Sequence, residues 1–299
     1  MKEVFINGKK YTFIKDYKDN EAYRKSYNSL TQKTYGFDFE DWYKAGYWGS
    51  TYKQYSLMDG ENIVSNVSIS IIDYLVLNER KRYVQLGAVM TDTNYRKQGL
   101  SKFLIEKVIE EWKDKCDMIY LFANNSVLDF YPKFGFTAAE EYRHFKEITY
   151  NNEVSAAEKL DMSQESSRKL LVEKIKNSNP VSKLAMLKNV GLIMFYCTSF
   201  MSDNVYYLRK QDLIVVAEFN GDTLYLQDII SDAEADLDTV ISCLANKTIK
   251  RVILGFTPTA SEDYCEELLV EEDSTLFILK GGESLFQDNK LKFPALSHA

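Results

Sequence analysis

The segment Tyr95-Arg96-Lys97-Gln98-Gly99-Leu100-Ser101 stands between two stretches with clear periodicity, and it decides the fold. Before it, the apolar run Tyr83 to Met90 predicts a buried strand. After it, apolar residues recur at helical spacing from Leu100 to Trp112, which predicts a helix that begins near Gln98 to Ser101. A second short strand, Met118 to Ala123, and the segment Tyr131-Pro132-Lys133-Phe134-Gly135-Phe136 complete this unit.

Two cations stand where a helix N-terminus normally favours acidic residues. The first N–H groups of a helix lack partners and carry the positive end of the helix dipole, so Arg96 and Lys97 are repelled there. A bound anion would offset this repulsion, and Gly99 would let successive backbone N–H groups approach phosphate oxygens. The segment therefore predicts a site for a phosphate-bearing cofactor; the simpler alternative is a solvated basic turn before an ordinary helix.

The pattern Arg96-x-x-Gly99-x-Ser101 resembles the Arg/Gln-x-x-Gly-x-Gly/Ala pyrophosphate loop of the GNAT acetyltransferase superfamily. The order of elements from Tyr83 to Phe136 agrees with that superfamily, and the one departure is Ser101, where the family usually has Gly or Ala. The resemblance covers Met1 to about Tyr150. It implies an α/β (α+β) fold in which helices flank a mixed twisted sheet, with acetyl-CoA as the cosubstrate and no metal.

The resemblance also implies roles for individual residues. The strand end would pair backbone groups with the pantetheine arm and polarise the thioester carbonyl, while Tyr131 would protonate the departing thiolate; a Tyr packed at a helix end is the alternative. The residues implied in cofactor binding are Val89, Met90, Thr91, Arg96, Lys97, Gln98, Gly99, Leu100, Ser101 and Asn124.

No general base is evident in the sequence. The strand Tyr83 to Met90 carries no Glu, where many family members place one, and only Gln85 and Asp92 are near. Deprotonation of the amine through water is therefore the default expectation. The tail Phe293-Pro294-Ala295-Leu296-Ser297-His298-Ala299 offers a sharper hypothesis, in which His298 or the terminal carboxylate reaches the active site; a frayed terminus is the commoner fate of such tails.

The length of 299 residues predicts two domains, because it exceeds what one hydrophobic core comfortably serves. Periodicity is lost across Asn151 to Lys159, which predicts an acetyl-CoA-binding GNAT domain at 1–150 and a second domain at 151–299. The element order of the second half echoes the first, but Asp228 to Leu237 has no glycine, no cation and several acids. We therefore expect a degenerate GNAT-like domain that closes the acceptor pocket or a homodimer interface; an unrelated α/β domain is the alternative.

Composition narrows the class of protein and its partners. The formal net charge of −7 comes from the half after residue 150, which argues against a nucleic-acid binder and favours a cationic small molecule or peptide amine. The four Cys are widely spaced and only His144 and His298 could join them, so neither a zinc site nor a disulfide framework is predicted. No apolar run is long enough to span a membrane and no signal peptide is evident, so we expect a cytoplasmic protein.

These observations predict an acyltransferase that moves an acetyl group from acetyl-CoA to a primary amine of a small molecule or peptide. A non-catalytic protein that senses acyl-CoA or binds a partner is the alternative, and a longer acyl or an aminoacyl donor also remains open. The aromatic cluster Phe37, Phe39, Trp42, Tyr43, Tyr47 and Trp48 lies where the resembling family shapes its acceptor pocket. Packing on the sheet is the favoured reading, because aromatic residues mostly fill cores.

Overall fold

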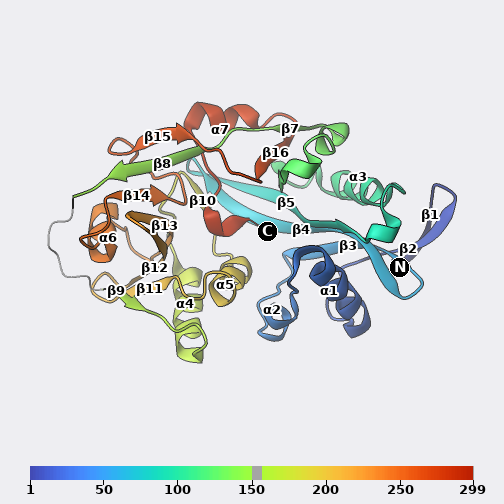
Figure 1. Ribbon diagram of the computed structural model, residues 1–299, viewed down its shortest axis with the longest axis horizontal. Coiled ribbons are helices and arrows are strands. Elements are labelled where there is room, and N and C mark those ends of the chain that lie inside the picture. The colour runs from blue at the N-terminus through green and yellow to red at the C-terminus, as the bar shows by residue number, and fades with distance from the viewer. Residues whose placement is uncertain (150–156, 299) are drawn as a thin grey trace.

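Two twisted sheets, each with strands from both halves of the chain, form the protein in the computed structural model, which describes residues 1–149 and 157–298 (Figure 1). The first sheet has the order β1-β2-β3-β4-β5-β6-β16-β7, with β10 paired to β4. Its strands are β1 (Lys2–Ile6), β2 (Lys9–Lys15), β3 (Tyr52–Asp59), β4 (Asn62–Val76), β5 (Glu79–Thr91), β6 (Met118–Ala123), β7 (Phe136–Ala138), β10 (Leu184–Met186) and β16 (Thr275–Leu279).

The second sheet has the order β15-β8-β14-β13-β12-β11-β9. Its strands are β8 (Tyr142–Glu147), β9 (Ala157–Lys159), β11 (Val205–Leu208), β12 (Leu213–Asn220), β13 (Thr223–Ile230), β14 (Arg251–Leu254) and β15 (Cys265–Leu268). β13 and β14 pair in parallel, as β5 and β6 do in the first sheet. The two sheets thus repeat one arrangement, as expected for a duplicated fold.

Helices cover both faces of the first sheet. α3 (Leu100–Trp112) buries its apolar stripe, including Leu104 and Val108, against Leu121 of β6. α1 (Glu21–Tyr35) and α2 (Glu40–Lys44) pack on the opposite face (Figure 1). The remaining helices are α4 (Glu165–Asn177), α5 (Val190–Thr198), α6 (Leu237–Leu244) and α7 (Glu283–Asn289). Within the described ranges, no helix has the length and apolarity needed to cross a bilayer.

The aromatic cluster after α1 forms part of the core beneath α1 and α2. Phe39, Trp42 and Trp48 are buried, and the Trp42 and Trp48 rings stack with centroids 5.4 Å apart. The Trp42 indole N–H donates to the carbonyl of Gly191 at 2.8 Å, which ties the first half to α5. For Phe39, Trp42 and Trp48 these contacts agree with the packing interpretation, since the three rings fill space between elements, whereas Tyr47 lines a pocket described below.

Besides β10, which pairs with β4, the two halves exchange one strand each. β8 comes from the first half of the chain but pairs with β14 and β15 of the second sheet. β16 comes from the second half, with whose strands it was expected to pair, but it lies between β6 and β7 of the first sheet. Both strands come last in their half and occupy the same relative place, next to the strand that pairs in parallel. Each sheet therefore needs residues from the other half of the chain.

The C-terminal segment, residues 291–298, runs between the sheets. The Phe293 ring stacks on Tyr120 of β6, with centroids 4.1 Å apart and 7° between the planes. The backbone N–H of Ala295 donates to the carbonyl of Gly255 at 2.8 Å, and Leu296 is fully buried in the second core. The segment therefore joins the two halves instead of fraying.

Glu141 holds this segment and predicts a pH dependence of stability. Its carboxylate is 8% exposed and accepts the Phe293 N–H at 2.7 Å. Burial raises its pKa to about 7, although the charge of Lys292 lowers it. Because an unfolded Glu titrates near ~4.3, the folded chain binds this proton more tightly, and its contribution to the free energy of unfolding falls as pH rises from about 4 to about 7.

Glu141→Gln keeps the acceptor for the Phe293 N–H and removes the charge. We expect it to raise the free energy of unfolding at pH 8 by on the order of 2 kcal/mol and to leave it unchanged at pH 4. Urea titrations at both values measure this, with Glu140→Gln at the exposed neighbouring position as the control. An equal effect of Glu141→Gln at both pH values would contradict the assignment.

Candidate functional site

A gap opens between β5 and β6 where their pairing stops. The last parallel pair is Leu86 with Leu121, yet β5 continues to Thr91. A bulge lies at this point: the register with β4 shifts, Ala88 has a φ of 43°, and the Asn66 side-chain amide donates to its carbonyl at 2.9 Å. Within the described residues, the β6-facing backbone edge of residues 87–91 has no partner strand, so it is free to pair with a ligand.

The turn between β5 and α3 ends in a helix N-terminus without a side-chain cap. Lys97 and Gly99 both have left-handed backbone, with φ of 61° and 82°. In the part of the chain that the structure describes, nothing accepts a hydrogen bond from the backbone N–H of Gly99, Leu100, Ser101 or Lys102. Such a run of free N–H groups at a helix start binds anions.

The same turn carries two cations that no acid neutralises. Arg96 and Lys97 are both exposed, and neither forms an ion pair with a described residue. The Arg96 guanidinium makes one long contact, from Nε to the carbonyl of Thr91 at 3.4 Å. Leu100 is buried in the core beneath α3, and Met90 is buried in the core beneath α1 and α2. Only the backbone of these two residues can therefore reach a ligand.

Contacts from other elements fix the shape of the turn. The Tyr11 hydroxyl donates to Gln98 Oε1 at 2.8 Å, and the Asn7 amide donates to the Gln98 carbonyl at 2.9 Å. The hydroxyls of Thr91 and Ser101 lie 2.7 Å apart. The hydroxyl of Ser101, the one departure from the family pattern, is therefore hydrogen-bonded to Thr91. No local pattern predicted the contacts of Asn7 and Tyr11, because both residues come from a distant hairpin.

Tyr131 lies on the other side of the gap, at the start of a 3-10 turn. Its ring is buried against Phe136 and Phe277, with centroids 6.1 and 6.0 Å away. Burial raises the pKa of Tyr131 to about 12, so the phenol is neutral near pH 7. Asn124 follows β6 and is exposed, and its side-chain oxygen accepts the Ser126 hydroxyl at 2.7 Å.

Tyr35 lies at the β5 side of the gap and was not predicted. Its hydroxyl donates to the carbonyl of Val89 at 3.1 Å. Burial raises the pKa of this hydroxyl, and nearby Tyr131 raises it further. Tyr35 therefore lies beside Val89. Tyr35 ends α1, 54 residues before its partner, and no local pattern in the sequence signals such a contact.

The candidate bases are already engaged or weak. Gln85 is buried and accepts the Tyr120 hydroxyl, whereas Asp92 accepts the Asn94 N–H at 3.0 Å and pairs with Lys33. The His298 ring stacks on Phe122 of β6 with centroids 3.8 Å apart, so the tail does reach the first sheet. Burial lowers the His298 pKa to about 3, which keeps the imidazole neutral. The terminal carboxylate belongs to Ala299 and lies outside the described residues.

The corresponding place in the second half is closed to anions. Pairing of β13 with β14 ends at Leu226, and α6 begins after the turn that follows β13. The Asp236 carboxylate accepts the Thr239 N–H at 3.1 Å and so fills the helix N-terminus. A phosphate there would meet this carboxylate and that of Asp238 instead of free N–H groups.

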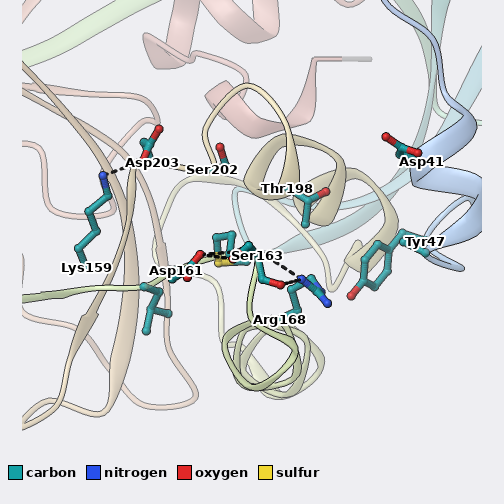
Figure 2. Close-up of a pocket in the computed structure, with 12 residues that line it drawn as sticks. Asp41, Tyr47, Lys159, Asp161, Ser163, Arg168, Thr198, Ser202 and Asp203 are labelled. Atoms are coloured by element: carbon teal, nitrogen blue, oxygen red, sulfur yellow. Dashed lines mark hydrogen bonds and ion pairs between the residues drawn. The ribbon is translucent and has the colours of Figure 1, made fainter.

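A separate pocket of about 630 Å³ lies between the halves (Figure 2). Asp41 and Tyr47 line one side, and Thr198, Ser202 and Arg168 line the other (Figure 2). The Arg168 guanidinium is held by the carbonyl of Met162 at 2.9 Å. None of the residues predicted to bind acetyl-CoA lines this pocket, so it is distinct from the gap beside β5.

Comparison with known proteins agrees with this geometry. A family profile described as an acetyltransferase (GNAT) domain matches residues 18–139, which include the turn, the gap and Tyr131. A search of curated proteins gives no match.

Solved structures share the fold over most of the chain. A conserved protein from Enterococcus faecalis V583 is 11% identical, with 93% of this chain and 75% of that chain covered and a TM-score of 0.57. A GCN5-related N-acetyltransferase from Kribbella flavida is 13% identical, with 90% and 70% covered and a TM-score of 0.55. Eis1 from Mycobacterium abscessus is 12% identical, with 89% and 72% covered and a TM-score of 0.53. Residues 18–139 therefore match a GNAT acetyltransferase domain, and the wider likeness to solved structures is one of fold.

Proposed function

We propose that this protein transfers an acetyl group from acetyl-CoA to a primary amine of a small molecule or peptide. The observation that carries the proposal is the gap beside β5, which has a free strand edge between a cationic helix N-terminus and a neutral phenol. The match of residues 18–139 to a GNAT acetyltransferase domain supports acyl transfer in general. The acetyl donor and the amine acceptor are the specific part of the proposal.

The residues of the turn suit a pyrophosphate. The free N–H groups of residues 99–102 would bind phosphate oxygens, and Arg96 and Lys97 would neutralise their charge. A Cβ at position 99 would lie 3.3 Å from the Asn7 side chain, and the left-handed φ of 82° would strain any residue that carries one. Glycine therefore keeps the backbone of the turn open to a phosphate. The unpaired edge of residues 87–91 would pair with the pantetheine amides.

Acetyl-CoA supplies the acetyl group as an activated thioester and leaves as the thiol. The amine nitrogen bonds to the carbonyl carbon as the C–S bond breaks, and backbone N–H groups near Val89 would stabilise negative charge on the carbonyl oxygen. Tyr131 holds a proton on its hydroxyl at neutral pH and would donate it to the departing sulfur. The proton from the amine would pass to water and then restore Tyr131.

Binding of the cosubstrate is tested by thermal unfolding. Acetyl-CoA and CoA are each expected to raise the midpoint, since ligand at 100 times its dissociation constant adds ~2.7 kcal/mol, whereas ATP is not. Arg96→Glu should abolish the rise by placing an acid beside the phosphate site. Lys113→Glu, an exposed position at the other end of α3, should preserve it.

The outcomes separate the candidate functions. A rise with CoA species that is followed by thiol release with an amine supports the transferase. A rise without thiol release for any amine would favour the non-catalytic acyl-CoA-binding alternative. Equal midpoints with and without CoA species would remove the pyrophosphate assignment for residues 96–101.

A further inference from the structure

A row of aromatic rings, Tyr35, Phe37, Phe195 and Phe200, crosses from the first half of the chain to the second; we call it the aromatic wall. Tyr35 and Phe37 stack with centroids 6.0 Å apart and 28° between the planes. The edge of Phe37 meets Phe200 at 5.4 Å, and Phe195 lies 5.7 Å from Phe200. The wall is therefore continuous from the end of α1 to the end of α5.

One end of the wall lies at the proposed reaction site. The Tyr35 hydroxyl donates to the Val89 carbonyl at 3.1 Å and is close enough to Tyr131 to raise its own pKa. The other end lies in solvent, where Phe200 is 59% exposed. An apolar surface that begins at a reactive centre and opens to solvent is suited to guide an acceptor.

The core behind the wall holds it in place. Phe195 packs on Phe39 and Trp42, each at a centroid distance of 5.4 Å, and both of those rings are buried. The wall is thus a preformed surface, which costs little ordering on binding.

The aromatic wall offers apolar contacts and the negatively polarised faces of its aromatic rings. Its four side chains carry no charge, and its one hydroxyl, that of Tyr35, already donates a hydrogen bond to the Val89 carbonyl. Such faces favour another aromatic ring in stacked or edge contact and attract a single ammonium group. A polyamine or an aminoglycoside would need several carboxylates or hydroxyl partners, which these side chains do not offer.

We propose that the acceptor is a primary amine with an aromatic ring, whose ring packs on Phe37 and Phe200 and whose amine extends toward Val89 and Tyr131. This inference rests on the proposed function and specifies its substrate class. The new C–N bond forms at the acetyl carbonyl, the C–S bond breaks, the sulfur takes a proton from Tyr131, and the proton from the amine passes to water.

The test uses the intact protein and compares three primary amines: one attached to an aromatic ring, one polyamine and one aminoglycoside. Thiol release from acetyl-CoA is measured with 2-phenylethylamine, spermidine and kanamycin, and kcat/KM is expected to be highest for 2-phenylethylamine. Phe200→Ala should raise KM for 2-phenylethylamine about five- to tenfold with little change in kcat, because stacking contacts are lost away from the reacting atoms. Phe219→Ala is the matched control, since Phe219 is 41% exposed and packs on Tyr206 outside the wall.

A second readout does not depend on turnover. Calorimetric titration of 2-phenylethylamine into CoA-saturated protein should show binding that Phe200→Ala weakens by the same factor and that Phe219→Ala leaves unchanged. A preference for spermidine or kanamycin, or equal effects of the two Phe variants, would overturn the aromatic class while leaving the transferase intact. Failure of acetyl-CoA to bind or of any amine to react would overturn the proposed function and, with it, this inference.

Discussion

A fragment of residues 1–149 is expected to remain unfolded, although it contains the whole turn, the gap and Tyr131. In the full chain β16 lies between β6 and β7, and its Phe277 and Ile278 are buried in the cores of the first sheet. Without β16, the fragment exposes the edge of β6 and the apolar residues beneath it. β8 also loses β14 and β15, its only partner strands in the described ranges.

Circular dichroism and urea titration measure this. The fragment should show no cooperative transition, whereas co-expression with residues 150–299 should restore one and allow the two pieces to copurify. The full chain cleaved within 150–156 serves as the control for the break itself, because it keeps every exchanged strand. A cooperative transition of the fragment alone would show that β16 is dispensable.

Tyr131→Phe is expected to lower kcat with the best amine by about 10²- to 10³-fold, the usual contribution of a placed general acid. The phenyl ring can keep its contacts with Phe136 and Phe277, so the KM for acetyl-CoA and the thermal midpoint should change little. Loss of kcat and kcat/KM in equal measure would identify an interaction made only in the transition state.

The pH profile supplies a second readout for Tyr131. Because burial raises its pKa to about 12, the wild-type phenol stays protonated and kcat should show no loss of this acid up to pH 9. Tyr142→Phe, which removes a hydroxyl that donates to Glu140, is the matched control and should leave kcat unchanged. Full activity of Tyr131→Phe would assign the tyrosine to packing and leave proton delivery to water.

Local patterns predicted the elements that form the site. The strand Met118 to Ala123 and the helix from Leu100 follow from apolar spacing alone, and both appear at those positions. The free N–H groups beside Gly99 agree with the argument from the helix dipole. The cofactor-binding and catalytic roles of individual residues, and the domains at 1–150 and 151–299, stay predictions.

Long-range contacts could not be predicted. The sequence marks Thr275–Leu279 as a strand, but apolar alternation does not say which sheet accepts it. Tyr35 reaches the gap, and His298 reaches β6, through backbone paths set by α1 and by the packing of Phe293. Such contacts depend on the relative placement of whole elements, which a single sequence does not encode in any short window.

The place of β16 in the first sheet also delays the completion of that sheet during synthesis. Ribosomes add about 5–20 residues per second, so the ~130 residues between β8 and β16 take roughly 6–26 s to emerge. During that interval the first sheet is incomplete, and the edge of β6, with Tyr120 and Phe122, has not yet paired with β16 or packed against Phe293. A slow stretch of translation before Thr275 would lengthen the exposure of this edge to chaperones and proteases, so we expect the yield of folded protein to depend on codons far from the candidate site.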